Sequence, residues 1–392
     1  MSEQAYVRTM PHLNIATMGH KGHGKTTLTA AVAAVLAARA PGGRPLPPPG
    51  RPPRATPSGR TTDFTHLAYA TDTRRYTHTD LPGDARFTTN MIAGAARLDG
   101  AILVVSALDG VGAQTTEHVL LARQAGVRHL VVALTKADAG RPERTGRVER
   151  DVRRLLTAHG HDGERTAVVR VSGLRALEGD PRWTGSVEAL LDAVDTYVPT
   201  PVRRTEAPFL LPVEKVLTIS RRGTVVTGAV ERGTVSLRDH VQLIGPPDGP
   251  RDTHVTGLEI FGTPLTTAAA GDSVALLLRG VLRHQVRRGD TVTAPGATVA
   301  RRRFTARVRL RPAAEGGRHT PVSTGYRPQF HLRTADVTGT VDLGGRGTAR
   351  PGETVTVAVR LDRGLPVEPG RSFSVREGGR TVATGTVTAV PE

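Results

Sequence analysis

The sequence predicts an α/β domain with a mostly parallel, doubly wound sheet, followed by two all-β barrel domains. Strand-like apolar runs alternate with helix-like runs from residue 11 to about residue 198, which is the pattern of an α/β domain. Three prolines among polar residues then interrupt the pattern at 199–208 and predict a linker. Beyond the linker helical periodicity disappears, and short Val- and Thr-rich runs punctuated by Gly and Pro predict two closed barrels.

The elements of the first domain follow in order along the chain. A buried strand is expected at 12–18 and an Ala-rich helix at 27–40. Further strands are expected at 75–79, 101–106, 129–134 and 167–171, and further helices at 115–125, 143–158 and 186–197. We therefore assign residues 1–198 to the first domain, 199–208 to the linker, 209–299 to the first barrel and 300–392 to the second.

Composition narrows the class of protein. The chain has 392 residues, no cysteine and a formal net charge of +17, so disulfides and thiolate metal sites are unavailable. The N-terminus has no apolar segment of the signal type, and the apolar stretch 30–38 is too short to span a bilayer. These features predict a cytoplasmic protein with no membrane partner. The positive charge would favour binding to phosphate backbones, but abundant Arg with little Lys is also what a GC-rich genome produces, and both explanations remain open.

The strongest local pattern is a phosphate loop at 19–26, which matches G-x-x-x-x-G-K-[ST]. It lies between the first expected strand and the first expected helix, where backbone N–H groups and the helix N-terminus can hold phosphate oxygens. Lys25 would neutralise the β and γ phosphates, and the Thr26 hydroxyl would bind Mg²⁺. A chance Gly-rich turn is the alternative. The residues assigned to the nucleotide here are Gly19, His20, Lys21, Gly22, His23, Gly24, Lys25, Thr26 and Thr27.

Three further loops follow expected strands in the order of a nucleotide-binding crevice. Asp80-Leu81-Pro82-Gly83 places a carboxylate near Mg²⁺ through water and a Gly N–H near the γ-phosphate. Thr135-Lys136-Ala137-Asp138 offers Asp138 to the guanine N1–H and N2–H₂ while Lys136 stacks over the ring. Ser172-Gly173-Leu174 would supply a backbone N–H to the guanine O6. The four loops together predict a P-loop GTPase domain that selects GTP over ATP.

These loops resemble the GTP-binding domain of bacterial elongation factor Tu, and the likeness covers almost the whole chain. Runs outside the loops carry it further, above all those in the second barrel at 315–321, 325–330 and 376–381, because other translational GTPases share the first two domains but not this barrel. The resemblance implies a divergent paralogue that binds GTP or GDP with Mg²⁺, carries aminoacyl-tRNA to the ribosomal A site and hydrolyses GTP. It also implies three other properties: the ribosome as a partner, an exchange factor of the elongation factor Ts type, and a monomeric state.

The resemblance places two switch segments, at about 41–65 and about 80–100. The first contains the one low-complexity stretch of the chain, the proline-rich 41–59, which cannot be helical. Counting back from Asp80 without gaps, Thr61 falls where the family has its Mg²⁺-binding switch threonine, with Thr62 as the alternative. An exposed linker threonine is the other explanation. Such a switch would depend on contacts with the γ-phosphate and Mg²⁺.

Departures from the family pattern bear on mechanism. Asp84 stands where the family has the histidine that orients the attacking water. Because a carboxylate brings negative charge toward the γ-phosphate, we expect impaired hydrolysis, with Lys25, Gly83 and Asp84 as the catalytic set. Thr135 replaces an asparagine that contacts guanine N7 and ties its loop to the phosphate loop, so we expect weaker nucleotide binding. Gly22 replaces an aspartate, for which tolerance is the simpler explanation.

Positions that face tRNA in the family are partly retained. His66, Asn90, Glu259 and Arg288 match, whereas Thr89, Lys215, Gly262 and Ser273 do not. Glu259 could equally be an exposed barrel carboxylate, and His66 a solvated loop histidine. Three functions are therefore weighed: an aminoacyl-tRNA carrier, a GTP-binding decoy with little hydrolysis or delivery, and an enzyme that borrows the same domains for other chemistry. The family-like region 315–330 argues against the third.

Overall fold

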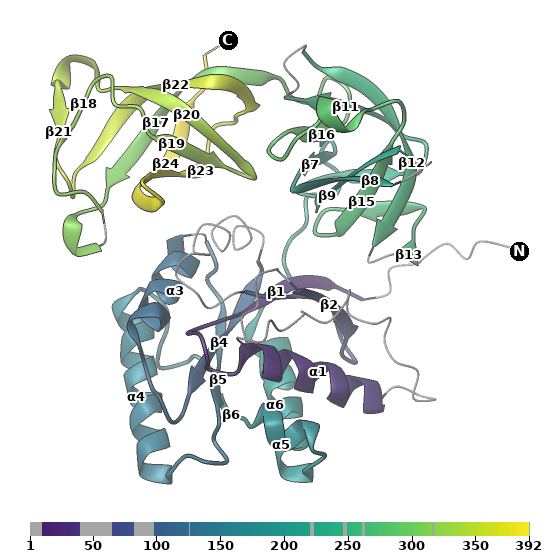
Figure 1. Ribbon diagram of the computed structural model, residues 1–392, viewed down its shortest axis with the longest axis vertical. Coiled ribbons are helices and arrows are strands. Elements are labelled where there is room, and N and C mark those ends of the chain that lie inside the picture. The colour runs from purple at the N-terminus through teal and green to yellow at the C-terminus, as the bar shows by residue number, and fades with distance from the viewer. Residues whose placement is uncertain are drawn as a thin grey trace, which may run out of the picture. The chain divides into compact units, whose positions relative to one another are not determined.

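The computed structural model describes residues 10–39, 65–81, 98–124, 126–219, 223–245, 249–260, 263–315 and 317–391. Thr61, Pro82, Gly83, Asp84 and Asn90 lie outside these residues. The chain divides into two compact units, Val7–Val202 and Arg203–Glu392 (Figure 1), and the division falls inside the segment 199–208. No helix in the described part of the chain is long and apolar enough to cross a membrane.

The first unit is built on a six-stranded sheet. Its strand order is β2-β3-β1-β4-β5-β6. Only β2 runs antiparallel to its neighbour; the other pairings are parallel. The strands in sheet order are β2 (Thr65–Ala70), β3 (Arg75–Asp80), β1 (His12–Met18), β4 (Gly100–Ser106), β5 (Leu130–Thr135) and β6 (Val168–Arg170). The central strands β4 and β5 are buried along their whole length, which explains their continuous apolar sequences.

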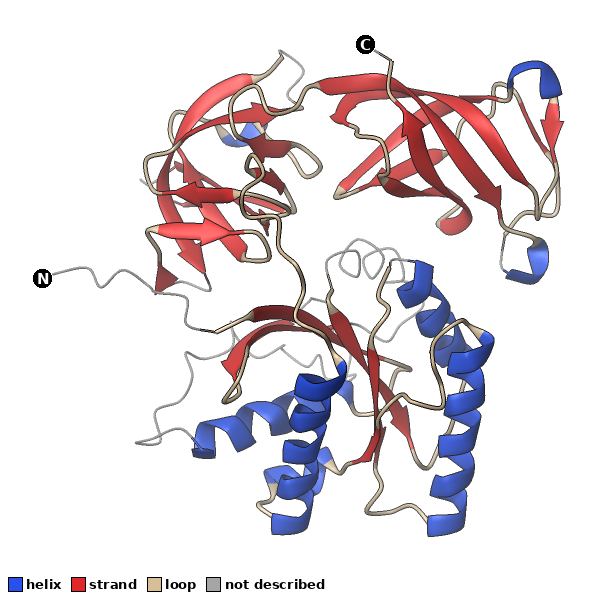
Figure 2. Cartoon of the chain, turned by 180° about the vertical axis from the view of Figure 1, so that it is seen from behind, coloured by secondary structure: helices blue, strands red, loops and turns tan. Residues whose placement is uncertain are grey.

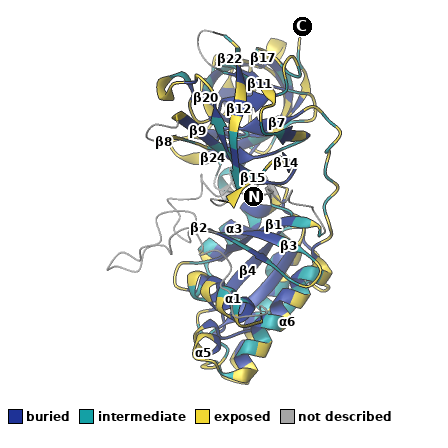
Figure 3. Ribbon diagram, turned by 90° about the vertical axis from the view of Figure 1, so that its right-hand side faces the viewer, coloured by how far each residue is buried: buried dark blue, intermediate teal, exposed yellow. Residues whose placement is uncertain are grey.

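Helices cover both faces of this sheet (Figure 2). They are α1 (Lys25–Arg39), α3 (Ala113–Gln124), α4 (Pro142–Ala158), α5 (Gly173–Leu177) and α6 (Pro181–Tyr197). Alternate residues of β1 enter two different cores. Leu13 and Ile15 pack with α1 and α6, whereas Ala16 and Met18 pack with α3 and α4. Because successive side chains of a strand point to opposite faces, β1 contributes to the core on each side of the sheet. Figure 3 shows the strands between the two helical layers as buried.

Two features of the helices differ from the sequence expectation. Helix α6 begins at Pro181 and not near 186, because Asp180 caps it through a hydrogen bond from the Arg182 N–H and Pro181 occupies the first turn. The short helix α5 was not expected. Its N-cap is Ser172, whose side chain accepts a hydrogen bond from the Arg175 N–H.

The first barrel of the second unit has one main hydrogen-bonded path. This path runs β7-β16-β11-β12-β15-β9-β8, and β13 extends it beside β12. Among the described residues no ladder joins β7 to β8; Leu210 of β7 instead forms an isolated antiparallel bridge with Arg232, beyond the end of β9, and the domain is a β-barrel as expected. The strands are β7 (Leu210–Pro212), β8 (Lys215–Ile219), β9 (Gly223–Ala229), β11 (His240–Ile244), β12 (Arg251–Ile260), β13 (Thr263–Pro264), β15 (Ser273–Leu278) and β16 (Thr291–Thr293), with β10 (Thr234–Ser236) paired to β14 (Thr267–Ala269).

The second barrel is closed, in the order β17-β22-β20-β19-β23-β24. Its interior contains Phe304, Phe330 and Phe373, whose ring centroids lie 5.6 to 6.3 Å apart. The strands are β17 (Ala300–Leu310), β19 (Gln329–Leu332), β20 (Ala335–Asp342), β22 (Thr354–Pro366), β23 (Ser372–Glu377) and β24 (Arg380–Ala389), with β18 (Val322–Ser323) paired to β21 (Thr348–Ala349). Alternating buried and exposed residues along β22 show why a Val- and Thr-rich sequence forms a barrel wall.

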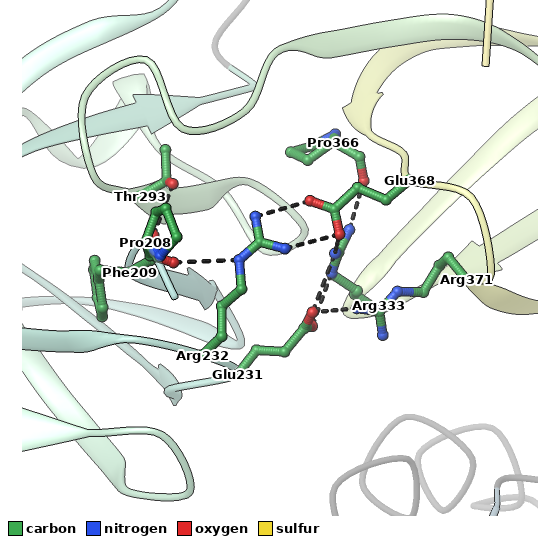
Figure 4. A network of polar contacts seen from close by, with 9 residues as sticks. All are labelled: Pro208, Phe209, Glu231, Arg232, Thr293, Arg333, Pro366, Glu368 and Arg371. Atoms are coloured by element: carbon green, nitrogen blue, oxygen red, sulfur yellow. Dashed lines mark hydrogen bonds and ion pairs between the residues drawn. The ribbon is translucent and has the colours of Figure 1, made fainter. Parts of the chain in front are cut away.

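Charged side chains connect the two barrels, which belong to one unit. We call the set Glu231, Arg232, Arg333, Glu368 and Arg371 the barrel seam (Figure 4). Arg333 Nε lies 2.8 Å from Glu231 Oε2, Arg232 Nη2 lies 2.8 Å from Glu368 Oε1, and Arg371 also pairs with Glu231. The Arg333 side chain is 6% exposed. The seam is therefore a mostly desolvated ionic contact.

Candidate nucleotide-binding site

The phosphate loop connects the end of β1 to the start of α1. Gly19 has φ +144° and Gly22 has φ +81°, backbone conformations that favour glycine. A Cβ atom at Gly19 would lie 2.2 Å from the carbonyl oxygen of Val104. The loop thus needs glycine at position 19 to pass this close to β4. At position 22 a Cβ atom would meet nothing within 4 Å, so only the positive φ favours glycine there.

Lys25 is the first residue of α1 and is buried beneath this loop. Its Nζ donates hydrogen bonds to the carbonyl oxygens of Gly19, at 3.0 Å, and His20, at 3.1 Å. Burial lowers the pKa of Lys25 to about 8, against the opposing effect of the Asp80 charge. The ammonium group therefore stabilises the loop through two of its carbonyl oxygens. It lies where the lysine of a phosphate loop contacts phosphate oxygens.

Asp80 ends β3 beside the same helix. Its Oδ2 accepts a hydrogen bond from Thr26 Oγ1, and its Oδ1 accepts one from Thr17 Oγ1, both at 2.7 Å. Burial raises the pKa of the Asp80 carboxyl, although both hydroxyl contacts and Lys25 act in the other direction. The fold thus brings the carboxylate of the second motif into contact with the hydroxyl of the first. These are hard oxygen atoms, the ligand type that Mg²⁺ prefers.

Thr135 ends β5 and connects the third motif to the phosphate loop. Its hydroxyl lies 2.6 Å from the carbonyl oxygen of His23, to which it donates, and 3.3 Å from that of Val105. From the resemblance to the family we expect this threonine to weaken nucleotide binding, because it replaces an asparagine that ties the two loops together. The described contacts show that the shorter side chain still reaches the loop, through a backbone carbonyl oxygen.

The two charged residues of the third motif each have an ionic partner. Lys136 adopts φ +55°, and its Nζ lies 3.0 Å from Asp109 Oδ2. Asp138 Oδ2 lies 3.7 Å from Arg175 Nε. Neither Asp109 nor Arg175 was selected from the sequence, because each lies outside the motif that it supports.

The fourth motif reaches the site through α5. A Cβ atom at Gly173 would lie 3.2 Å from the backbone N of Leu28, so glycine allows α5 to pack directly against the start of α1. Ser172 is buried as the N-cap, and Leu174 is 58% exposed. Because β1, β3, β5 and β6 are parallel, all four loops leave the sheet at one edge, as the crevice rule requires.

His118 is a further residue that sequence reasoning missed. It lies on α3, and its Nδ1 accepts a hydrogen bond from the Gly19 N–H at 3.1 Å. Burial lowers the pKa of His118 to about 4, so the imidazole is neutral and able to accept this bond at pH 7. Its sequence signal is that of an ordinary core histidine. Within the described residues no group of three or more His, Cys, Asp or Glu side chains could hold a metal ion.

The residues assigned to tRNA lie on separate elements. His66 belongs to β2, opposite Thr79 of β3. Glu259 belongs to β12, opposite Ala275 of β15. Arg288 is in the other unit from His66, where its Nε donates to the carbonyl oxygen of Thr334 at 3.3 Å. Glu259 and Arg288 therefore lie in one unit and His66 in the other.

A mostly parallel sheet with a phosphate loop, an Asp-x-Pro-Gly motif and a Thr-Lys-x-Asp motif at one edge, followed by two barrels, defines the class of translational P-loop GTPases. The chain matches three family models: "Elongation factor Tu GTP binding domain" over residues 10–200, "Elongation factor Tu domain 2" over 223–293 and "Elongation factor Tu C-terminal domain" over 297–391. It is 62% identical over 393 residues to Elongation factor Tu 2 of Streptomyces avermitilis, covering 100% of both chains. The chain therefore belongs to the elongation factor Tu family and is a translation elongation GTPase of that type.

Proposed function

We propose that this chain, in its GTP form, carries aminoacyl-tRNA to the ribosomal A site and releases it when GTP is hydrolysed to GDP and phosphate. The observation that carries this proposal is the junction of the nucleotide loops, where Thr26 meets Asp80 and Thr135 meets His23. Family membership over all three domains supports the same function. The activity is the GTPase activity of the family.

In this proposal each loop residue has one task. The phosphate loop, residues 19–27, holds the phosphates with its backbone N–H groups and the Lys25 ammonium. Thr26 and Thr61 would supply hydroxyl oxygens to Mg²⁺, Asp80 would act on it through water, and the ion would neutralise phosphate charge. Asp138 would read the guanine edge, Lys136 would cover the ring, and the Ser172–Leu174 segment would meet O6.

We further propose that hydrolysis is impaired. The catalytic set is Lys25, Gly83 and Asp84, of which only Lys25 lies among the described residues. A carboxylate at position 84 can accept a hydrogen bond from water, but its charge repels the γ-phosphate as negative charge develops there. Loss of one positioned transition-state group lowers rates by about 10² to 10³.

The partners follow from the same proposal. Aminoacyl-tRNA would meet His66, Asn90, Glu259 and Arg288, and the ribosome would stimulate hydrolysis. An exchange factor of the elongation factor Ts type would replace GDP by GTP, and the protein would act in the cytoplasm as a monomer without a membrane partner. The barrel seam supports this carrier function because it joins the two barrels into one unit that can present a single surface.

A filter-binding titration tests the proposal. Labelled aminoacyl-tRNA is titrated with the full chain, first with GTP and Mg²⁺ and then with GDP. Binding in the GTP form that falls in the GDP form is the expected result. Absence of binding in both forms would overturn the carrier function, and absence of heat from guanine nucleotides in calorimetry with Mg²⁺ would overturn the nucleotide site itself.

Asp84 also favours a second candidate function, a GTP-binding decoy. Such a protein would hold GTP and tRNA without efficient hydrolysis or delivery. Peptide-bond formation on programmed ribosomes separates the two functions: a carrier supports repeated rounds, whereas a decoy that binds tRNA inhibits the reaction of an active elongation factor.

A further inference from the structure

Arg175 stands at the centre of a small charged group beside the guanine motif. Its Nε lies 3.7 Å from Asp138 Oδ2, and its Nη1 lies 2.8 Å from Glu178 Oε2. The backbone N–H of Arg175 donates to Ser172 Oγ at 3.3 Å. One residue therefore contacts both Ser172 and Asp138, which belong to the two loops assigned to the guanine base.

The two distances have different chemical meanings. At 2.8 Å the guanidinium donates a charge-assisted hydrogen bond to Glu178. At 3.7 Å it attracts the Asp138 carboxylate without hydrogen bonding to it, because the separation exceeds hydrogen-bond range. Asp138 keeps its lone pairs available, while a nearby positive charge favours one orientation of a carboxylate that otherwise rotates with little preference.

The helix α5 fixes this arrangement. Arg175 and Glu178 are three residues apart, a spacing that places side chains on the same helical face. The N-cap at Ser172 anchors the start of the turn, and the Glu178 N–H donates to the Leu174 carbonyl oxygen at 3.1 Å at its end. The guanidinium is thereby held near Asp138 but directed to Glu178.

We propose that Glu178 and Arg175 are positioning residues for guanine recognition. Glu178 binds the guanidinium, so that Arg175 orients the Asp138 carboxylate without forming hydrogen bonds to its oxygen atoms. Without Glu178, the same guanidinium is free to form a bidentate pair with Asp138, and the two acceptors needed by guanine N1–H and N2–H₂ are lost. This inference rests on the proposed function, because it assumes that Asp138 reads the base.

The experiment compares GDP with inosine diphosphate, which lacks the N2 amino group. The dissociation constant of inosine diphosphate divided by that of GDP, measured by calorimetry on the full chain with Mg²⁺, reports the second hydrogen bond to Asp138. A charge-assisted hydrogen bond corresponds to about a tenfold or larger change in affinity. We expect Glu178→Ala to lower the ratio about tenfold and Arg175→Ala to lower it by about threefold.

The double variant decides the mechanism. The loss of discrimination in Glu178→Ala requires the free guanidinium of Arg175. The double variant, with both Arg175→Ala and Glu178→Ala, should therefore show the same ratio as Arg175→Ala alone. Effects that add, or a Glu178→Ala ratio equal to wild type, would overturn the inference. A role confined to the stability of α5 would change the unfolding temperature or the affinity for both nucleotides, but not their ratio.

Matched controls come from another exposed pair of the same unit. Arg154 Nη2 lies 3.2 Å from Asp151 Oδ1, also at a spacing of three residues on a helix. Arg154→Ala and Asp151→Ala should leave the ratio unchanged. If wild type binds no guanine nucleotide, the proposed function fails; if it binds and discriminates but the Arg175 and Glu178 variants match wild type, only this inference fails.

Discussion

The hydroxyl of Thr135 donates a 2.6 Å hydrogen bond to the carbonyl oxygen of His23. The two residues are 112 positions apart in the chain, and this contact joins the guanine motif to the phosphate loop. Both residues are buried. The nucleotide loops are therefore connected directly, and not only through the sheet that carries them.

Thr135→Val should weaken nucleotide binding. Valine keeps the shape but leaves the His23 carbonyl oxygen without its donor, and a net loss of about 1 to 1.5 kcal/mol corresponds to roughly tenfold in affinity. Fluorescent GDP analogues would measure this change. The control is Thr157→Val, which removes an exposed hydroxyl bonded to the Arg153 carbonyl oxygen at 3.1 Å. Unchanged GDP affinity in Thr135→Val would show that the contact has no part in binding.

Asp84→His should restore ribosome-stimulated hydrolysis. Replacing the carboxylate by a group that orients water without added negative charge should raise the single-turnover rate by about 10² to 10³. Quench-flow measurement with programmed ribosomes checks this, with nucleotide affinity measured alongside to exclude a binding effect. Equal rates in the two proteins would contradict the proposed impairment.

The stability of the α/β unit should fall as the pH decreases from about 6.5 to about 4. His78 is fully buried, its Nε2 has no hydrogen-bond partner among the described residues, and burial lowers its pKa from 6.5 to about 4. In this range the unfolded chain binds a proton that the folded chain does not, so unfolding becomes more favourable as protons are added.

His78→Phe should reduce that pH dependence by the share of one histidine, because phenylalanine binds no proton, whereas His23 and His118 of the same unit, whose pKa values burial also lowers to about 4, still contribute. Trp183, the single tryptophan and a core residue of this unit, supplies the fluorescence signal for unfolding. The matched control is the exposed His129→Gln. A pH slope that is the same in His78→Phe and wild type would refute this assignment.

Glu231→Gln should destabilise the second unit. The barrel seam holds three arginines and two glutamates, so neutralising Glu231 leaves Arg333 and Arg371 facing each other with less compensation. Removing one partner of a buried ion pair costs about 3 to 5 kcal/mol. Chemical denaturation followed by circular dichroism measures the loss.

The control for the seam is Asp362→Asn. Asp362 pairs with Arg327 at 2.9 Å, but their side chains are 47% and 59% exposed, and exposed pairs contribute about 0 to 1 kcal/mol. Equal losses in the two variants would mean that burial of the seam does not matter to stability.

Elements whose formation depends on nearby residues could be predicted from the sequence, and elements that depend on contacts between distant residues could not. The central strands were expected correctly because a buried parallel strand is a continuous apolar run, as in β4 and β5. The five-residue helix α5 was not, because its stability depends on the Ser172 cap and on packing against α1, and five residues carry no periodic signal.

The nucleotide motifs were visible in the sequence because each is local. Their supporting residues were not. His118 lies 99 positions from Gly19, and Asp109 lies 27 positions from Lys136. Both contacts arise only after the parallel strands bring their carboxyl ends together. Nothing near either residue in the sequence marks it, since a buried histidine and a loop aspartate are common in any α/β domain.

The composition of the barrel seam has a consequence for protein engineering. Arginine and glutamate side chains are readily solvated when the surfaces that they join are separated. A chimaera that receives a foreign last barrel would therefore expose charged side chains of the first barrel at the junction, and not an apolar surface. The graft would fail through electrostatic mismatch, and the remedy is to introduce Arg333, Glu368 and Arg371 into the foreign barrel, because Glu231 and Arg232 remain in the recipient.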